Sequence, residues 1–234
     1  MRRYPPGIVM LAFALVCVIP AVSLAATTPG TLLSRILAAG RAQHSVHYVS
    51  TAQLGTLRVV QVGDVGAVEG IQRITYQKAR TTGHVTVIVS ARSAYIRGDA
   101  FALVNYMGFN AAASAKYANT WVSIPHGDRD YANVAGNVTL PSVIDSLQGR
   151  GHPAAAPDTT IGGRRVVGVQ WRALVGGKLV VVRLYARASG RPLPVEQRAT
   201  HGSAVVSVTF SRWNERVRIT APKSSVPIAT TGLE

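Results

Sequence analysis

Segments in which apolar and polar residues alternate, joined by short turns, constrain the fold of this 234-residue chain most strongly. Residues 84–90, for example, set Val85, Val87 and Val89 against His84, Thr86 and Ile88. Loops this short predict antiparallel hairpins, because parallel strands need long crossovers. Strands are expected at residues 45–52, 57–62, 68–78, 84–90, 95–97, 120–124, 165–174, 178–187, 194–200, 204–213 and 217–221. Their one-sided apolar pattern predicts a sheet with one covered face.

A helical insert over about residues 98–148 separates two groups of strands. Asp99 and Asn110 are suited to cap helices over residues 100–107 and 111–118. Further helical patterns occupy residues 128–134 and 140–147, and an N-terminal helix is expected over residues 31–43, because their apolar residues recur at helical spacing. The combination predicts an α+β fold in which the helices cover one face of an antiparallel sheet.

The N-terminus has the pattern of a secretory signal peptide over residues 1–25. Basic residues at positions 2 and 3 precede an apolar stretch from Ile8 to Pro20, and Ser23-Leu24-Ala25 gives a small-x-small cleavage motif. We therefore expect export to the periplasm, the cell envelope or the medium. Cys17, the single cysteine, follows Val16 and not the small residue of a lipidation motif, so lipid anchoring there is not expected.

The net charge of +15 predicts anionic partners such as lipid headgroups or cell-wall polyanions. The basic residues, nearly all arginine, stand singly along the strands and form no run of five. Nucleic-acid binding is not expected, because the basic stripe with interleaved aromatic residues is missing and the chain is exported.

No catalytic motif is present: the sequence lacks Gly-x-Ser-x-Gly, His-Glu-x-x-His, a P-loop and a dinucleotide glycine pattern. Once the signal peptide is removed there is no cysteine for thiolate chemistry. Asp128 and Asp130 flank Arg129 in an expected loop, and His44 and His47 have no third metal ligand nearby in sequence. We expect neither enzymatic activity nor a cofactor or metal.

Two segments carry a resemblance to a known family. Residues 94–125, AYIRGDAFALVNYMGFNAAASAKYANTWVSIP, resemble the central segment of exported LolA/LppX/LprG-like proteins. Residues 210–217, FSRWNERV, followed by Ile219 and Pro222, are similar to the closing strand pair of that superfamily. The order of helix, strands, helical insert and strands also fits, over roughly residues 31–222.

The resemblance implies a half-open β-barrel, a strongly curved antiparallel sheet whose concave side is plugged by helices. The domain would span residues 26–222, with a flexible tail at 223–234. The family implies a lipid or acylated ligand on the concave side. We expect the sheet wall of that cavity to comprise Val60, Val62, Ile74, Tyr76, Val85, Val87, Val169, Trp171, Val182, Leu184, Val208 and Phe210. The insert would add Leu103, Tyr106, Met107, Phe109 and Ile144.

The leading hypothesis is a monomeric, non-catalytic carrier for a lipid or acylated molecule with an anionic headgroup, with a membrane surface as a further partner. The alternative is an envelope interaction or sensor module that uses the same fold with a filled core. Several hundred Å³ of connected apolar space would favour the carrier. A hydrolase would require Asp99, Asp128, Asp145 and a histidine to share one cleft.

Overall fold

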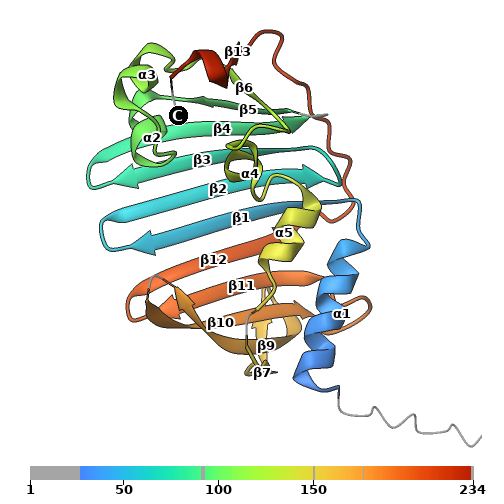
Figure 1. The fold of residues 1–234 in the computed structure, drawn as a ribbon. Helices are drawn as coiled ribbons and strands as arrows, with labels where there is room; N and C mark the ends of the chain where they lie inside the picture. Colours follow the sequence, from blue (N-terminus) through green and yellow to red (C-terminus); the bar gives the residue numbers. More distant parts are fainter. Residues whose placement is uncertain (1–26, 91–92, 150, 176, 233–234) are drawn as a thin grey trace, which may run out of the picture.

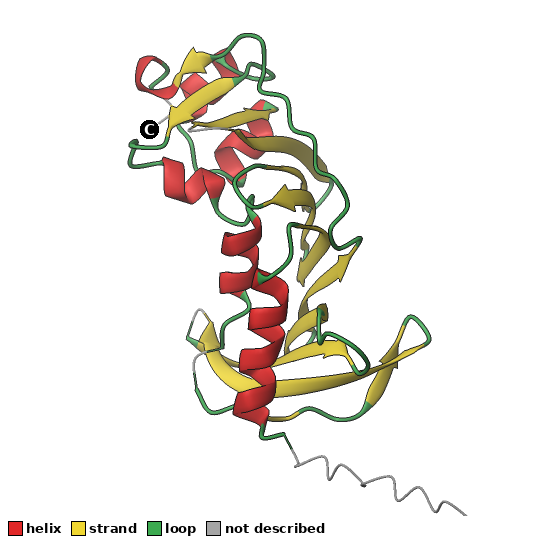
Figure 2. Ribbon diagram, turned by 90° about the vertical axis from the view of Figure 1, so that its right-hand side faces the viewer, coloured by secondary structure: helices red, strands yellow, loops and turns green. Residues whose placement is uncertain are grey.

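The computed structural model describes residues 27–90, 93–149, 151–175 and 177–232. In this part of the chain one thirteen-stranded sheet bends around helices that lie on its concave side (Figures 1 and 2). This arrangement confirms the predicted α+β fold with a curved, open sheet. The predicted signal peptide and Cys17 lie outside the described residues.

The strands follow the alternating segments closely, and β2 and β4 are longer than expected. The first group comprises β1 (Ser45–Leu54), β2 (Leu57–Gly66), β3 (Gly70–Lys78), β4 (Thr81–Ser90), β5 (Ser93–Gly98) and β6 (Val122–Pro125). The second group comprises β7 (Ala154–Ala155), β8 (Thr159–Ile161), β9 (Arg164–Val175), β10 (Lys178–Arg187), β11 (Pro194–His201), β12 (Ala204–Ser211) and β13 (Val226–Pro227).

The two groups join through β1 and β12, which pair antiparallel with Tyr48 opposite Phe210. The strand order is β13-β6-β5-β4-β3-β2-β1-β12-β11-β10-β9-β7, with β8 paired to β9. The pairs are antiparallel apart from β13 on β6. Because neighbouring strands are linked by tight turns, four hairpin tips line up along one edge of the sheet, on the left in Figure 1.

The helices form two separate blocks on the concave side (Figure 1). The first block consists of α1 (Pro29–Arg41) and α5 (Leu140–Ser146), which pack on each other and lie over β9 to β12. The second consists of α2 (Ala100–Asn105), α3 (Ala111–Lys116) and α4 (Tyr131–Ala135), beside β4 and β5. Asp99 and Asn110 cap α2 and α3 through their side chains, as predicted.

Each block has its own hydrophobic core. Ile36 and Ile144 pack against Val169, Leu184 and Phe210 in the first core. The second core comprises Ile74, Val85, Val87, Val89, Ala94, Ile96, Ala102, Leu103, Val122, Ile124, Val134, Val138 and Ile228. The concave side is therefore covered at both ends of the sheet by separate packing units. None of the helices in the described part is long and apolar enough to cross a membrane.

The C-terminal region differs from the sequence-based expectation. Residues 217–221, expected as a strand, run as an irregular strap along the ends of the strands. Part of the expected flexible tail is packed: β13 pairs with β6, and a 3-10 turn, η1 (Ile228–Thr230), buries Ile228 to 1% exposure. Sequence reasoning missed this contact because Ile228 is one apolar residue in a Ser/Thr/Pro-rich segment.

We predict that Ile228→Ala destabilises the fold by about 2–5 kcal/mol, because it leaves a cavity in the second core. Ile219→Ala is the matched control, since Ile219 lies half-buried on the strap. Chemical denaturation measures both. Equal and small effects would contradict the packing of the C-terminal turn.

Candidate functional site

The concave side carries a cleft of about 690 Å³ beside the first helical block. It opens toward the β9–β10 hairpin, and both sides of that hairpin contribute to its lining. Its wall consists of Ser146, Gln148, Trp171, Arg172, Ala173, Leu174, Leu179, Val182, Gln197 and Ala199. A mainly apolar wall with a few polar groups is the usual composition of a site for an apolar ligand.

A smaller cavity of about 80 Å³ lies deeper, between the two helical blocks. Its lining includes Tyr48, Gln61, Val208 and Phe210. Ser146 lines both this cavity and the larger cleft, so the two spaces lie side by side at the end of α5. Together they extend from the edge of the sheet toward its centre.

Tyr48 lines the inner cavity. Its hydroxyl donates to the backbone oxygen of Asn137 at 2.8 Å and accepts from Nε2 of Gln72 at 2.6 Å. The ring lies over Gly63, where an added Cβ would overlap it. Burial raises the pKa of Tyr48 well above its usual range, and the hydrogen bond from Gln72 offsets only part of that rise.

A second tyrosine marks the border of the other block. The amide Nε2 of Gln61 donates to the Tyr106 hydroxyl at 2.6 Å. Burial raises the pKa of Tyr106, again partly offset by this bond. The Tyr76 ring packs against the rings of Phe101 and Tyr106, with centroids 5.8 and 5.6 Å apart. This aromatic group and the neighbouring core fill the concave side beside α2.

The predicted cavity residues separate into four groups. Four line the cleft or the inner cavity: Trp171, Val182, Val208 and Phe210. Three helical-insert residues are partly buried against the second core: Tyr106, Met107 and Phe109. Eight are buried within the packed interior: Ile74, Tyr76, Val85, Val87, Leu103, Ile144, Val169 and Leu184. The structure therefore brings only a minority of the predicted residues to an open space.

The fourth group, Val60 and Val62, corrects a prediction. Val62 is paired with Arg73 and lies on the same face as Asp64, two residues further along β2. Both residues face the convex side, whereas Val59 and Val65 pack against the concave cores. Sequence reasoning assigned the wrong face because β2 has valines at both odd and even positions, so the alternation does not show which face is apolar.

Several cleft residues were missed by sequence reasoning. Ala173 and Ala199 belong to the same alternating series as Trp171 and Val182, but a selection of large side chains omitted them. Leu174 and Leu179, 76% and 51% exposed, flank a glycine turn. Strong exposure of two leucines at a hairpin tip cannot be inferred from the alternating pattern alone.

The acids named for a hydrolase hypothesis have separate structural roles. Asp99 caps α2, and Asp145 on α5 pairs with Arg41 at 2.8 Å. Asp128 accepts a hydrogen bond from the backbone nitrogen of Asp130. None of the clefts described here contains these three acids together. The described residues also contain no group of three metal-binding side chains.

Solved structures share this fold. LprF from Mycobacterium bovis superposes with a TM-score of 0.51 at 16% identity, covering 83% of this chain and 99% of LprF. The Mycobacterium tuberculosis lipoprotein LppX gives 0.50 at 15% identity, covering 82% of this chain and 99% of LppX. No protein-family profile and no curated protein matches the sequence. The likeness confirms the expected half-barrel fold over most of the chain.

We predict that Tyr48→Phe destabilises the protein by about 1–3 kcal/mol, because it leaves the buried amide of Gln72 without its acceptor. The wild type should also lose stability as the pH rises above about 10, since a buried tyrosine holds its proton in the folded state and releases it when unfolded. This alkaline loss should be smaller in Tyr48→Phe. Thermal unfolding from pH 7 to 11 measures both effects, and identical alkaline profiles would contradict the role of Tyr48.

Proposed function

We propose that this chain is an exported, non-catalytic carrier that binds an acyl chain or a similar lipid in the concave cleft. The observation that carries the proposal is the cleft of about 690 Å³ between α5 and β9 to β11, which has a smaller inner cavity beside it. This volume falls within the usual range for small-molecule sites. Most of its apolar side chains come from the paired strands β9, β10 and β11.

The energetics favour an apolar chain in this place. Each methylene that leaves water contributes roughly 0.8 kcal/mol, so a long acyl chain retains several kcal/mol after the losses of ordering. A fold shared with LprF and with the lipoprotein LppX is compatible with this role. The family resemblance of residues 94–125 and 210–217 points to the same ligand class.

The alternative function is an interaction or sensor module with a filled core. The observation in its favour is that Val87, Leu184 and Ile144 are at most 1% exposed, so both helical blocks pack tightly on the sheet. A carrier would bind a lipid in the cleft, and an interaction module would not. A lipid-binding measurement therefore distinguishes the two functions.

We predict that a fluorescent fatty acid binds to the wild type and that Ala199→Trp abolishes most of this binding, because an indole there fills the cleft. Thr200→Trp is the matched control, since the neighbouring residue on β11 faces the convex side. Fluorescence titration measures both, and native mass spectrometry detects any lipid retained through purification. Absence of probe uptake by the wild type would favour the interaction module.

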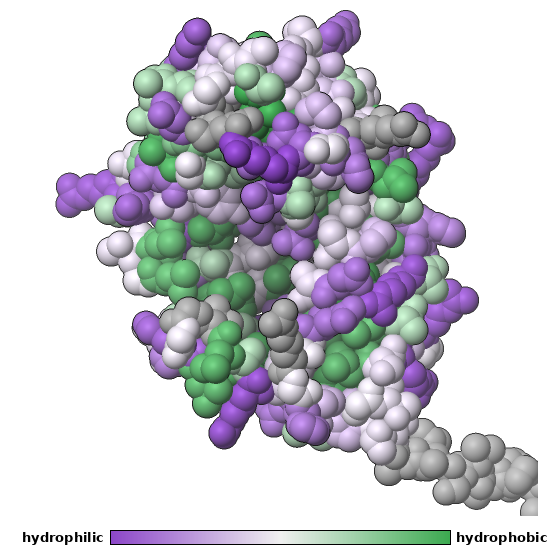
Figure 3. Space-filling model, in the orientation of Figure 1, coloured by the Kyte–Doolittle hydropathy of each residue, from purple (hydrophilic) through white to green (hydrophobic). Residues whose placement is uncertain are grey.

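We further propose that the hairpin edge beside the cleft docks on an anionic membrane surface. Leu54, Leu174 and Leu179 are 47%, 76% and 51% exposed at two of its tips. Figure 3 shows apolar surface along this side of the molecule. The four hairpin segments, residues 52–58, 77–82, 172–179 and 198–204, contain lysines and arginines and no acidic residue. Exposed leucines among basic side chains suit insertion between anionic headgroups.

We predict that Leu174→Ser with Leu179→Ser weakens binding to vesicles containing anionic phospholipid by about tenfold or more, because two apolar contacts with the bilayer are lost. Val68→Ser is the control, since Val68 is 72% exposed at the opposite end of the strands. Vesicle co-sedimentation at low and high salt measures the effect. Equal losses in both variants would contradict a docking role for the hairpin edge.

A further inference from the structure

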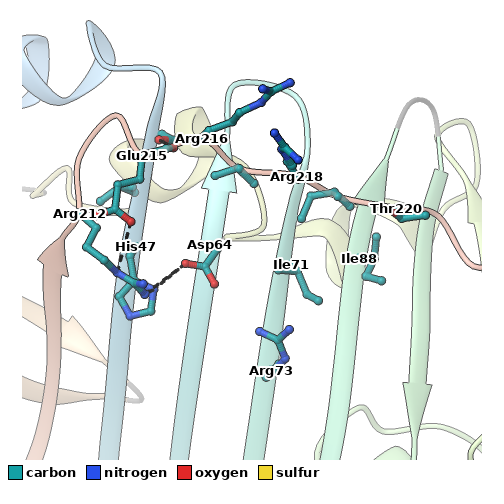
Figure 4. A pocket seen from close by; sticks show the side chains of 14 residues that line it. His47, Asp64, Ile71, Arg73, Ile88, Arg212, Glu215, Arg216, Arg218 and Thr220 are labelled. Carbon is teal, nitrogen blue, oxygen red and sulfur yellow. Dashed lines mark hydrogen bonds and ion pairs between the residues drawn. The ribbon is translucent and has the colours of Figure 1, made fainter.

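The convex side carries a second, independent cleft of about 410 Å³ (Figure 4). Its floor is a row of side chains across four paired strands: His47, Asp64, Ile71 and Ile88. Its outer wall is the strap formed by residues 212–220, which crosses the ends of these strands. Ser45 and Glu215, 170 positions apart in the sequence, therefore meet in this cleft. Its lining includes no residue of the helices on the concave side.

The strap is fixed to the sheet at its start and continues along the cleft in irregular conformation. Arg212 and Asn214 have left-handed φ values of 48° and 66°, which turn the chain sharply out of β12. Asn214 then holds the N-terminal end of β1: its backbone nitrogen donates to Ser45 O, and its side chain bonds His44 and Gln43. The Glu215 backbone nitrogen donates to Arg212 O at 3.4 Å, and its backbone oxygen accepts from Ser45 Oγ. Beyond Glu215, the next backbone hydrogen bond among the described residues is from Val226 N to Trp121 O. The intervening segment spans the cleft without pairing to a strand.

The acids in this cleft are already occupied. Asp64 accepts from His47 Nδ1 at 2.7 Å and lies 3.5 Å from the Arg212 guanidinium. Glu215 lies 3.9 Å from the same arginine. Arg212 also contacts His47 Nδ1, and that nitrogen cannot donate to Asp64 and accept from Arg212 at the same time. Arg212 and Asp64 therefore compete for the same nitrogen of His47.

Three further arginines line the cleft with no carboxylate partner among the described residues: Arg73, Arg216 and Arg218. With Arg212 they give four positive charges against the two carboxylates of Asp64 and Glu215. In Figure 4, Arg73 and Arg218 lie on either side of Ile71, while Arg216 extends away at the rim. Ile88 is only 7% exposed and Ile71 is half-buried, so part of the floor is apolar.

We propose that this convex cleft binds the phosphate group of a phosphate monoester, with Arg73 and Arg218 as its principal donors. A guanidinium group can donate two parallel hydrogen bonds to phosphate oxygens, so two arginines that line one cleft suit such an anion. The apolar floor at Ile71 and Ile88 accommodates the carbon atoms next to the phosphate. This site lies on the opposite face from the acyl cleft and does not depend on lipid binding there.

The test uses octyl phosphate, inorganic phosphate and uncharged octyl glucoside in calorimetric titrations of the intact mature chain at low ionic strength. Octyl phosphate should bind to the wild type, and the affinity should fall with added salt. Loss of two charge-assisted hydrogen-bonding groups in Arg73→Gln with Arg218→Gln should weaken it by about a hundredfold. Arg58→Gln is the matched control, because Arg58 is exposed on the same face of β2 at the hairpin end.

The outcomes separate the two sources of phosphate and the two clefts. If inorganic phosphate binds as tightly as octyl phosphate, the cleft is still a phosphate site, and its ligand is the free anion. Unchanged octyl phosphate affinity in the double variant, or equally tight octyl glucoside, overturns the proposal. Ala199→Trp should leave octyl phosphate binding intact, so failure of the acyl-carrier proposal would leave this result untouched. Thermal unfolding of each variant checks that the fold is retained.

Discussion

The packing of Tyr48 over Gly63 is the contact on which the concave side depends. It lets the ring lie flat on β2 while its hydroxyl reaches the insert backbone at Asn137. Gly70, on the next strand, also allows a close contact, because an added Cβ there would overlap the backbone oxygen of Val138. Two glycines thus bring the insert against the middle of the sheet, and the helices can diverge from this point toward its two ends.

The open space follows from that geometry. With the insert held at the centre, α5 joins α1 over one end of the sheet, and α2 to α4 cover the other. Neither block extends to the hairpin tips of β9 and β10, so the apolar side chains there have no helical cover. The cleft is therefore a consequence of covering a long curved sheet with short helices, and its mouth coincides with exposed Leu174 and Leu179.

Sequence reasoning succeeded where local patterns decide the structure. Alternation predicted the strands, and helical spacing and capping residues predicted the insert. Both agree with the observed elements, apart from residues 217–221, which form no strand. It failed where distant contacts decide. The face of Val60 and Val62 depends on the register that places Gly63 opposite Tyr48, and burial of Ile228 depends on β6. The arginine cleft was missed because β1 and the strap meet only through the pairing of β1 with β12.

A single sheet serves both proposed sites through alternate residues of the same strands. On β1, Tyr48 borders the concave cavity while His47 lies on the floor of the convex cleft. Neighbouring side chains of a strand point to opposite faces, so substitutions that keep the backbone intact can separate the two sites. A proline in β1 or β2 would instead remove a ladder hydrogen bond and disturb both. The arginines of the convex cleft are thus separate from the apolar concave cleft. They need not contribute to binding of the ligand proposed for the concave side.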